Sequence, residues 1–98
     1  MTQSTETQTY LALSGLDFEG YGVPKHTQGM LLRYVYNRYS PGSFGRAILA
    51  DKMEAAEWAA DSENLISLPE IDRWIKDKLP AEMRGSYEAV DEWCYGKG

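Results

Sequence analysis

Prolines, glycines and capping residues divide this 98-residue chain into short segments whose apolar residues recur at helical spacing. The first segment spans about residues 27–39, where Met30, Leu31, Tyr34 and Val35 share one face of a helix. Thr27 is the expected N-cap, because its hydroxyl can accept a hydrogen bond from a free N–H of the first turn. Ser-Pro-Gly at 40–42 ends this helix, because a residue before proline is disfavoured in helical geometry.

Three further helical segments follow along the chain. The second is expected to start at Ser43 as its N-cap and to continue to Ala59. The residues that follow at helical spacing on one face are Phe44, Ala47, Ile48, Asp51, Ala55, Trp58 and Ala59. Asp61 can cap a short turn that carries Leu65 and Ile66. Ser67 and Glu70 match the capping-box spacing at the start of a third helix, whose apolar stripe is Ile71, Trp74, Ile75 and Leu79. Ser86 is the expected N-cap of a last helix.

Four helices joined by short loops predict an all-α fold, a small four-helix bundle-like domain over residues 23–98. Residues 1–22 begin with a polar Thr- and Gln-rich tail and end in a glycine-rich stretch, so we expect a flexible, irregular N-terminal arm. Three Trp, seven Tyr and two Phe are a heavy aromatic load for a core of this size. Either all of them are core, or some lie at a ligand site or at the interface of a homo-oligomer.

The composition excludes several classes of protein. The single cysteine, Cys94, cannot form an internal disulfide, and with only one histidine the chain lacks a zinc-ligand cluster, so we expect no metal and no cofactor. No apolar run is long enough to cross a bilayer, and residues 1–9 do not resemble a signal peptide. The expected location is the cytoplasm. The net charge of −5 argues against general nucleic-acid binding.

Charge is unevenly distributed along the chain. Residues 20–50 carry four basic residues and no acidic one, whereas the flanking stretches are both net acidic. Two expected helix N-termini fall inside this positive stretch, and their free N–H groups favour phosphate. We therefore predict an anion site, with tyrosine rings available to stack a base, formed by Lys25, His26, Thr27, Arg33, Tyr36, Tyr39, Ser43, Phe44 and Arg46. The alternative is a solvated basic face that pairs with the acidic C-terminal half.

No catalytic constellation is evident in the sequence. His26 is the only imidazole, and it is more simply explained as a residue that hydrogen-bonds locally before the first helix. Ser43 lies on a turn into a helix, but Pro41 stands where the nucleophile elbow requires glycine. We therefore expect a protein that is not an enzyme, because His26 is the only side chain available as an imidazole base for catalysis.

Several motifs occur in a fixed order along residues 23–95. They are Val-Pro-Lys-His-Thr at 23–27, Pro-Gly-Ser-Phe at 41–44, Asp-Ser-Glu-Asn at 61–64 and a closing Trp93. This pattern is similar to that of a widespread family of short phage and prophage proteins. The chain departs from the family at Ala50, where an asparagine is frequent.

The resemblance implies a small, oligomeric, non-enzymatic protein related to phage sponges that sequester the cyclic nucleotide signals of bacterial immunity. Its implied partner is a cyclic oligonucleotide or another nucleotide-derived signal in the host cytoplasm, without membrane association. A second hypothesis is a protein that binds and inhibits a host defence complex, of the anti-CRISPR or anti-restriction type, through its acidic C-terminal helices.

Overall fold

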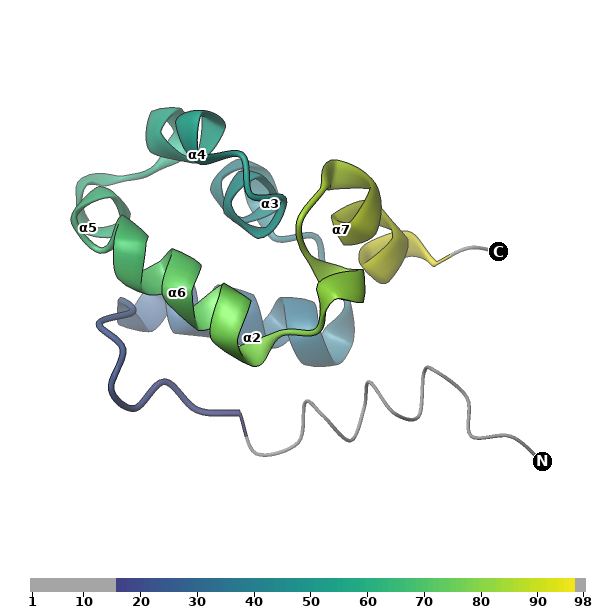
Figure 1. Cartoon of the computed structure of the whole chain (residues 1–98), viewed down its shortest axis with the longest axis horizontal. Helices are drawn as coiled ribbons and strands as arrows, with labels where there is room; N and C mark the ends of the chain where they lie inside the picture. Colours follow the sequence, from purple (N-terminus) through teal and green to yellow (C-terminus); the bar gives the residue numbers. More distant parts are fainter. Residues whose placement is uncertain (1–15, 97–98) are drawn as a thin grey trace.

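The computed structural model describes residues 16–96, and this part of the chain is entirely helical, which confirms the predicted all-α fold (Figure 1). The elements are α2 (Lys25–Asn37), α3 (Gly42–Leu49), α4 (Met53–Ala59), α5 (Ser62–Ile66), α6 (Leu68–Lys78), the 3₁₀ turn η1 (Ala81–Met83) and α7 (Tyr87–Tyr95). Each predicted helical segment contains at least one of these helices, although the bounds differ. The polar tail and most of the predicted arm lie outside the described residues.

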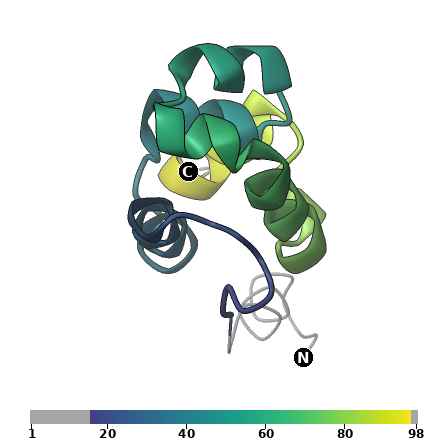
Figure 2. The ribbon, with the colours of Figure 1, turned by 90° about the vertical axis from the view of Figure 1, so that its left-hand side faces the viewer.

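Helix α3 lies at the centre of the fold and contacts α4, α6 and α7. Residues 47–50, at its C-terminal end, are all buried. Figure 2 shows α2 and α6 on two sides of the molecule, with α3 and α4 above them. The predicted apolar stripe of α2 is buried through Leu31, Tyr34 and Val35, and the predicted stripe of α6 is buried completely. The periodicity of these two helices therefore identified most of the core.

Tyr34 and Trp93 join three elements at the α7 side of this core. The buried Tyr34 hydroxyl donates a hydrogen bond of 2.7 Å to the Met83 carbonyl in η1. The Trp93 indole N–H of α7 donates at 2.8 Å to the Tyr34 carbonyl. Because these polar groups are paired inside the protein, they cost little desolvation energy and fix α7 against α2.

The second predicted helix is divided in two, so its expected continuity to Ala59 is wrong. Ala50 ends α3, and Asp51 takes the left-handed conformation with φ of 62°. Aspartate tolerates this conformation better than most residues, and Lys76 of α6 holds its carboxylate at 3.3 Å. The chain then starts α4 in a new direction, which buries Ala56 and leaves Trp58 86% exposed.

Two predicted N-caps are also wrong, since the N-caps of α2 and α3 are Pro24 and Pro41, not Thr27 and Ser43. Ser67 is the N-cap of α6, as predicted, but its side chain makes no capping hydrogen bond, so the capping box is not formed. Proline supplies a fixed φ near a helix start, so these two helices begin slightly earlier than the hydroxyl residues suggested. The caps by Asp61 and Ser86 are confirmed, since their side chains accept N–H bonds from Asn64 and Ala89.

The described part of the N-terminal arm lies along α6. The ring of Phe18 stacks on Trp74, with ring centroids 4.4 Å apart, and the Trp74 indole donates at 2.8 Å to the Asp17 carbonyl. The Tyr21 hydroxyl donates at 2.7 Å to Asp77. This segment is irregular, as predicted, and it extends the core over one side of α6 before the chain enters α2.

Candidate functional site

The structure divides the predicted anion-site residues between two places. Lys25, His26 and Thr27 form the first turn of α2, whereas Ser43 and Arg46 belong to α3. Helix α2 has 13 residues, and a rise of 1.5 Å per residue makes it about 20 Å long. Since α3 starts just beyond the C-terminal end of α2, the two helix N-termini cannot meet at one cavity. The expected convergence is therefore wrong.

The other predicted site residues are spread from the middle of α2 to the first turn of α3. Arg33 and Tyr36 are on the exposed face of α2, and Tyr39 is exposed in the following loop. Phe44 is partly buried and packs against the hydrophobic core. Tyr39 and Phe44 are close in sequence to the start of α3, but Tyr39 is exposed and Phe44 packs on the core, so the rings do not form one stacking site.

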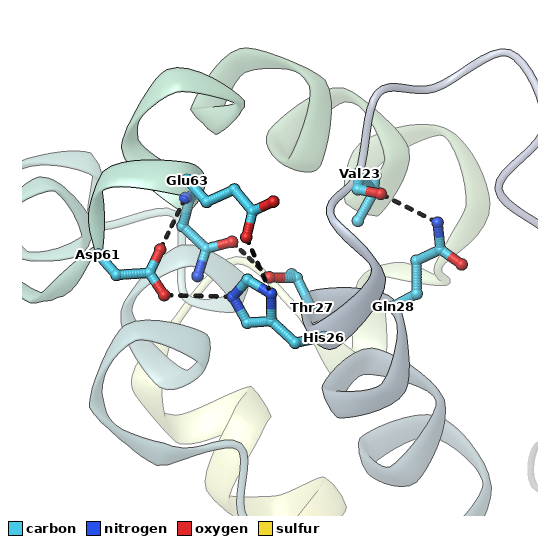
Figure 3. Close-up of polar contacts among 7 residues, drawn as sticks. Val23, His26, Thr27, Gln28, Asp61 and Glu63 are labelled. Carbon is cyan, nitrogen blue, oxygen red and sulfur yellow. Dashed lines mark hydrogen bonds and ion pairs between the residues drawn. The ribbon is translucent and has the colours of Figure 1, made fainter.

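The start of α2 is closed by side chains from α5 (Figure 3). The two ring nitrogens of His26 lie 3.2 Å from Asp61 and 3.4 Å from Glu63. The hydroxyl of Thr27, which is buried, donates a hydrogen bond to the side-chain oxygen of Asn64, which is also buried. We call this arrangement the closed N-terminus.

The acidic groups at the closed N-terminus serve the structure of α5. Asp61 accepts the Asn64 N–H at 2.8 Å as the cap of that helix. This hydrogen bond, together with the His26 ring, lowers the pKa of the Asp61 carboxyl. Two carboxylates therefore stand where an anion would approach, and repulsion disfavours phosphate here. The sequence signal was the Asp-Ser-Glu-Asn run at 61–64, but its pairing with 26–27 was not predicted.

The start of α3 opens into a pocket with a volume of about 480 Å³. The N-cap Pro41 makes no side-chain hydrogen bond, and the first N–H groups of a helix have no partner within it. The pocket is lined by Ser40, Gly42, Ser43, Arg46 and Ala47 at the α3 side, by Ala55 and Ala59 of α4 and by Tyr87 of α7. The small alanine side chains leave the hollow unfilled. We call this arrangement the open N-terminus.

Arg46 is held at this pocket by α7. Its Nε and Nη2 donate to the two carboxylate oxygens of Asp91 at 3.0 and 2.8 Å, and its guanidinium lies 4.3 Å from the centre of the Tyr87 ring. The ion pair lowers the pKa of Asp91 and raises that of Arg46. Nη1 takes no part in this pair, so the guanidinium keeps donors for a ligand while Asp91 offsets part of its charge.

Tyr87 and Asp91 were not predicted as site residues. They lie some forty positions after Arg46 in sequence, and no spacing rule relates the two stretches. Ala55 and Ala59 were assigned to the apolar face of an uninterrupted helix. Only the break at Asp51 places them beside the start of α3.

The structure separates the two groups that the sequence offered for catalysis, Ser43 and His26. Ser43 and His26 stand at opposite ends of α2, so they do not form a nucleophile and base pair. Within residues 16–96, no three His, Cys, Asp or Glu side chains gather in a group that would hold a metal ion. In the same part of the chain, no helix has the length and hydrophobicity needed to span a bilayer.

Comparisons with known proteins found no matching protein-family model, no similar curated protein and no similar solved structure.

Proposed function

We propose that this protein binds a cyclic nucleotide signal of bacterial immunity at the open N-terminus and sequesters it without cleaving it, as a phage-encoded counter-defence protein in the host cytoplasm. The observation that carries the proposal is the pocket of about 480 Å³ at an uncapped helix start, with Arg46 and Tyr87 on its wall. Backbone N–H groups and a guanidinium suit phosphate, and an aromatic ring suits a base.

The size of the pocket supports a ligand of this class. Sites for small organic ligands commonly measure roughly 300–1,000 Å³. Ala47, Ala55 and Ala59 provide an apolar lining against which a planar base can lie, and Ser43 adds a hydroxyl close to the N–H groups. Lys52 has its ammonium 5.9 Å from the Tyr87 ring, which adds positive charge near the same wall.

The cyclic character of the ligand rests on the resemblance to the phage protein family. The Pro-Gly-Ser-Phe motif of that resemblance occupies 41–44, where it forms the start of α3 and part of the pocket lining. Two of the other motifs, at 23–27 and 61–64, meet at the closed N-terminus. In this proposal the Pro-Gly-Ser-Phe motif binds the ligand, whereas the motifs at 23–27 and 61–64 stabilise the fold.

Isothermal titration calorimetry with a panel of cyclic di- and trinucleotides tests the proposal. We expect one or more members to bind, and Arg46→Ala to weaken binding by at least about 10-fold, because a hydrogen bond to a charged group contributes about 1.5–3 kcal/mol. Arg33→Ala is the matched control, since it removes the same charge from the exposed face of α2. No binding across the panel, or equal losses in both variants, would reject this site.

Two further measurements separate sequestration from the other hypotheses. The ligand should be recovered chemically intact after the complex is denatured by heat, whereas an enzyme would release cleaved products. A tagged protein should retain the nucleotide in a host lysate without a stoichiometric protein partner. An inhibitor of a defence complex would instead capture that complex whether or not the nucleotide is present.

A further inference from the structure

The corner formed by α4 and α5 exposes large apolar side chains to solvent. Trp58 is 86% exposed, Ile66 80% and Leu65 48%. Figure 1 shows the two helices at the same end of the molecule, joined by a short connection. Burying such side chains is favourable by about 1.5–3 kcal/mol each, so a surface that leaves three of them in water is typical of a contact site.

The position of Trp58 on α4 fixes its exposure. Ala56 is the buried residue of this helix, and two residues at about 100° each place Trp58 close to the opposite side. The Trp58 side chain accordingly leaves the core and lies on the surface, where its ring is accessible to a partner.

The charged residues of these two helices and their connection are all acidic, and the His26 ring of α2 lies against two of them, Asp61 and Glu63. Glu54, Glu57, Asp61 and Glu63 lie on the same two helices and their connection, and no Lys or Arg occurs from residue 53 to residue 72. We call Trp58, Leu65, Ile66 and these acids the α4–α5 face. A partner for it needs apolar side chains together with positive charge.

The solvent side of α2 has these properties. Lys25, Leu32, Arg33 and Tyr36 fall on the side of the helix opposite its buried residues, and Tyr36 is 48% exposed. The helix contains no acidic residue. Within the described residues, no ion pair is formed by Lys25 or Arg33. We call these four residues the α2 face.

We propose that the α4–α5 face of one copy of this protein docks on the α2 face of a second copy. The two faces are complementary in charge, and each carries aromatic and aliphatic side chains. Trp58 is the expected anchor, because buried tryptophans dominate the energy of many interfaces. Glu54 and Glu57 would stand at the rim opposite Lys25 and Arg33, where they set the orientation.

The symmetry of the assembly follows from the faces involved. Because they are two different surfaces, the contact is heterologous and each copy can bind one neighbour at either face. Such contacts close into a ring when the rotation between neighbours permits it. None of the residues of either face lines the pocket at α3, so association is independent of the proposed nucleotide binding.

Sedimentation equilibrium of the full chain, with no ligand added, tests this inference. We expect a mass above that of one protomer that rises with protein concentration and falls with salt. Trp58→Ser should raise the dissociation constant at least about 10-fold, the threshold of roughly 1.4 kcal/mol that many interface anchors exceed. Its fold should be intact, because Trp58 contributes nothing to the core.

Charge reversal identifies the partner face. Glu57→Lys and Arg33→Glu should each weaken association, and the double variant should recover a large part of it, because opposite charges again face each other. Glu19→Lys is the control, since it makes the same change on the N-terminal segment and should leave association unaltered. A wild-type chain that stays monomeric at all concentrations overturns the inference. So does a double variant no better than the singles, or a host protein that binds the wild type and not Trp58→Ser.

Discussion

The N-termini of α2 and α3 look alike in the sequence but differ in the fold. Each begins with a proline N-cap that makes no side-chain hydrogen bond, and each has basic residues nearby. The start of α2 meets Asp61, Glu63 and Asn64 and is closed. The start of α3 meets alanines and a tyrosine, and a pocket remains.

This difference shows that the neighbours of a helix start decide whether it can bind an anion. Asp61 is beside α2 because α5 needs a cap for its own first turn, so the acid that caps one helix also occupies the start of another. Opposite the start of α3, Ala55 and Ala59 of α4 leave a pocket that larger side chains would fill. Basic residues alone do not distinguish the two cases.

The largest effect is expected from opening the closed N-terminus. Thr27→Val keeps the shape of the side chain but removes the hydroxyl that bonds the buried Asn64. The amide is then left without its partner, which should lower the free energy of unfolding by about 2 kcal/mol. Urea denaturation followed by circular dichroism measures this change.

Thr27→Ser, which keeps the hydroxyl, should lose less stability than the valine variant. Nucleotide binding should be unchanged in both, because the open N-terminus is about 20 Å away along α2. If Thr27→Val reduced binding at temperatures where it remains folded, the separation of the two termini would be contradicted.

A smaller effect is expected from crowding the open N-terminus. A Cβ atom at Gly45 would lie 2.6 Å from the Pro41 ring and 2.9 Å from the Met30 sulfur. Overpacking of this kind costs about 1–3 kcal/mol, and the better helix propensity of alanine offsets roughly 1 kcal/mol of it. Gly45→Ala should therefore lower stability by about 1 kcal/mol net.

Gly29→Ala is the matched control within α2. Its added Cβ would meet only the movable end of Arg33 at 3.3 Å, so the gain in helix propensity should dominate and stability should rise by about 0.5–1 kcal/mol. Thermal unfolding of both variants distinguishes the two results. Equal shifts in the same direction would mean that the start of α3 is not closely packed against α2.

The sequence predicted the parts of this protein that follow from local periodicity. The buried stripes of α2 and α6, the Asp61 and Ser86 caps and the all-α class depend on residues within a few positions of each other. The break at Asp51 interrupts a continuous helical periodicity, and its carboxylate pairs with Lys76 of α6, 25 residues away. The exposure of Trp58 and the pocket wall made by Ala55 and Ala59 follow from this break, so they could not be predicted. The partners of His26, Thr27 and Arg46 lie 35 or more residues away, so no spacing rule pairs them.

The contribution of Arg46 to ligand binding at the open N-terminus can be tested by neutralising Asp91, the acid that faces it. Asp91→Asn deletes a negative charge while an amide oxygen can still accept one hydrogen bond from the guanidinium. We expect affinity for the nucleotide identified in the panel to rise several-fold, because a phosphate no longer competes with a carboxylate for Arg46. Glu19→Gln, which makes the same charge change far from the pocket, should have little effect in the same titration.

The smallest expected effect is on the pH dependence of stability. Combined with hydrogen exchange, it again distinguishes the closed from the open N-terminus. Asp61 has its pKa lowered from 3.8 by the Asn64 N–H and by His26, so the stability it contributes is present above about pH 3.8 and is lost as pH falls through its lower folded value. Asp61→Asn keeps an oxygen that can cap α5 but removes this titration. The urea midpoint of the variant should therefore fall less than that of the wild type as the pH is lowered below about 3.8. Because Asp91 has a lowered pKa of the same sign, Asp91→Asn should flatten the same curve. Loss of the Asp61 charge should also reduce the protection from hydrogen exchange at pH 7 of the Gln28 amide, the first amide of α2 that is hydrogen-bonded, at 2.9 Å to the Pro24 carbonyl. Asp91→Asn should leave this amide unaltered.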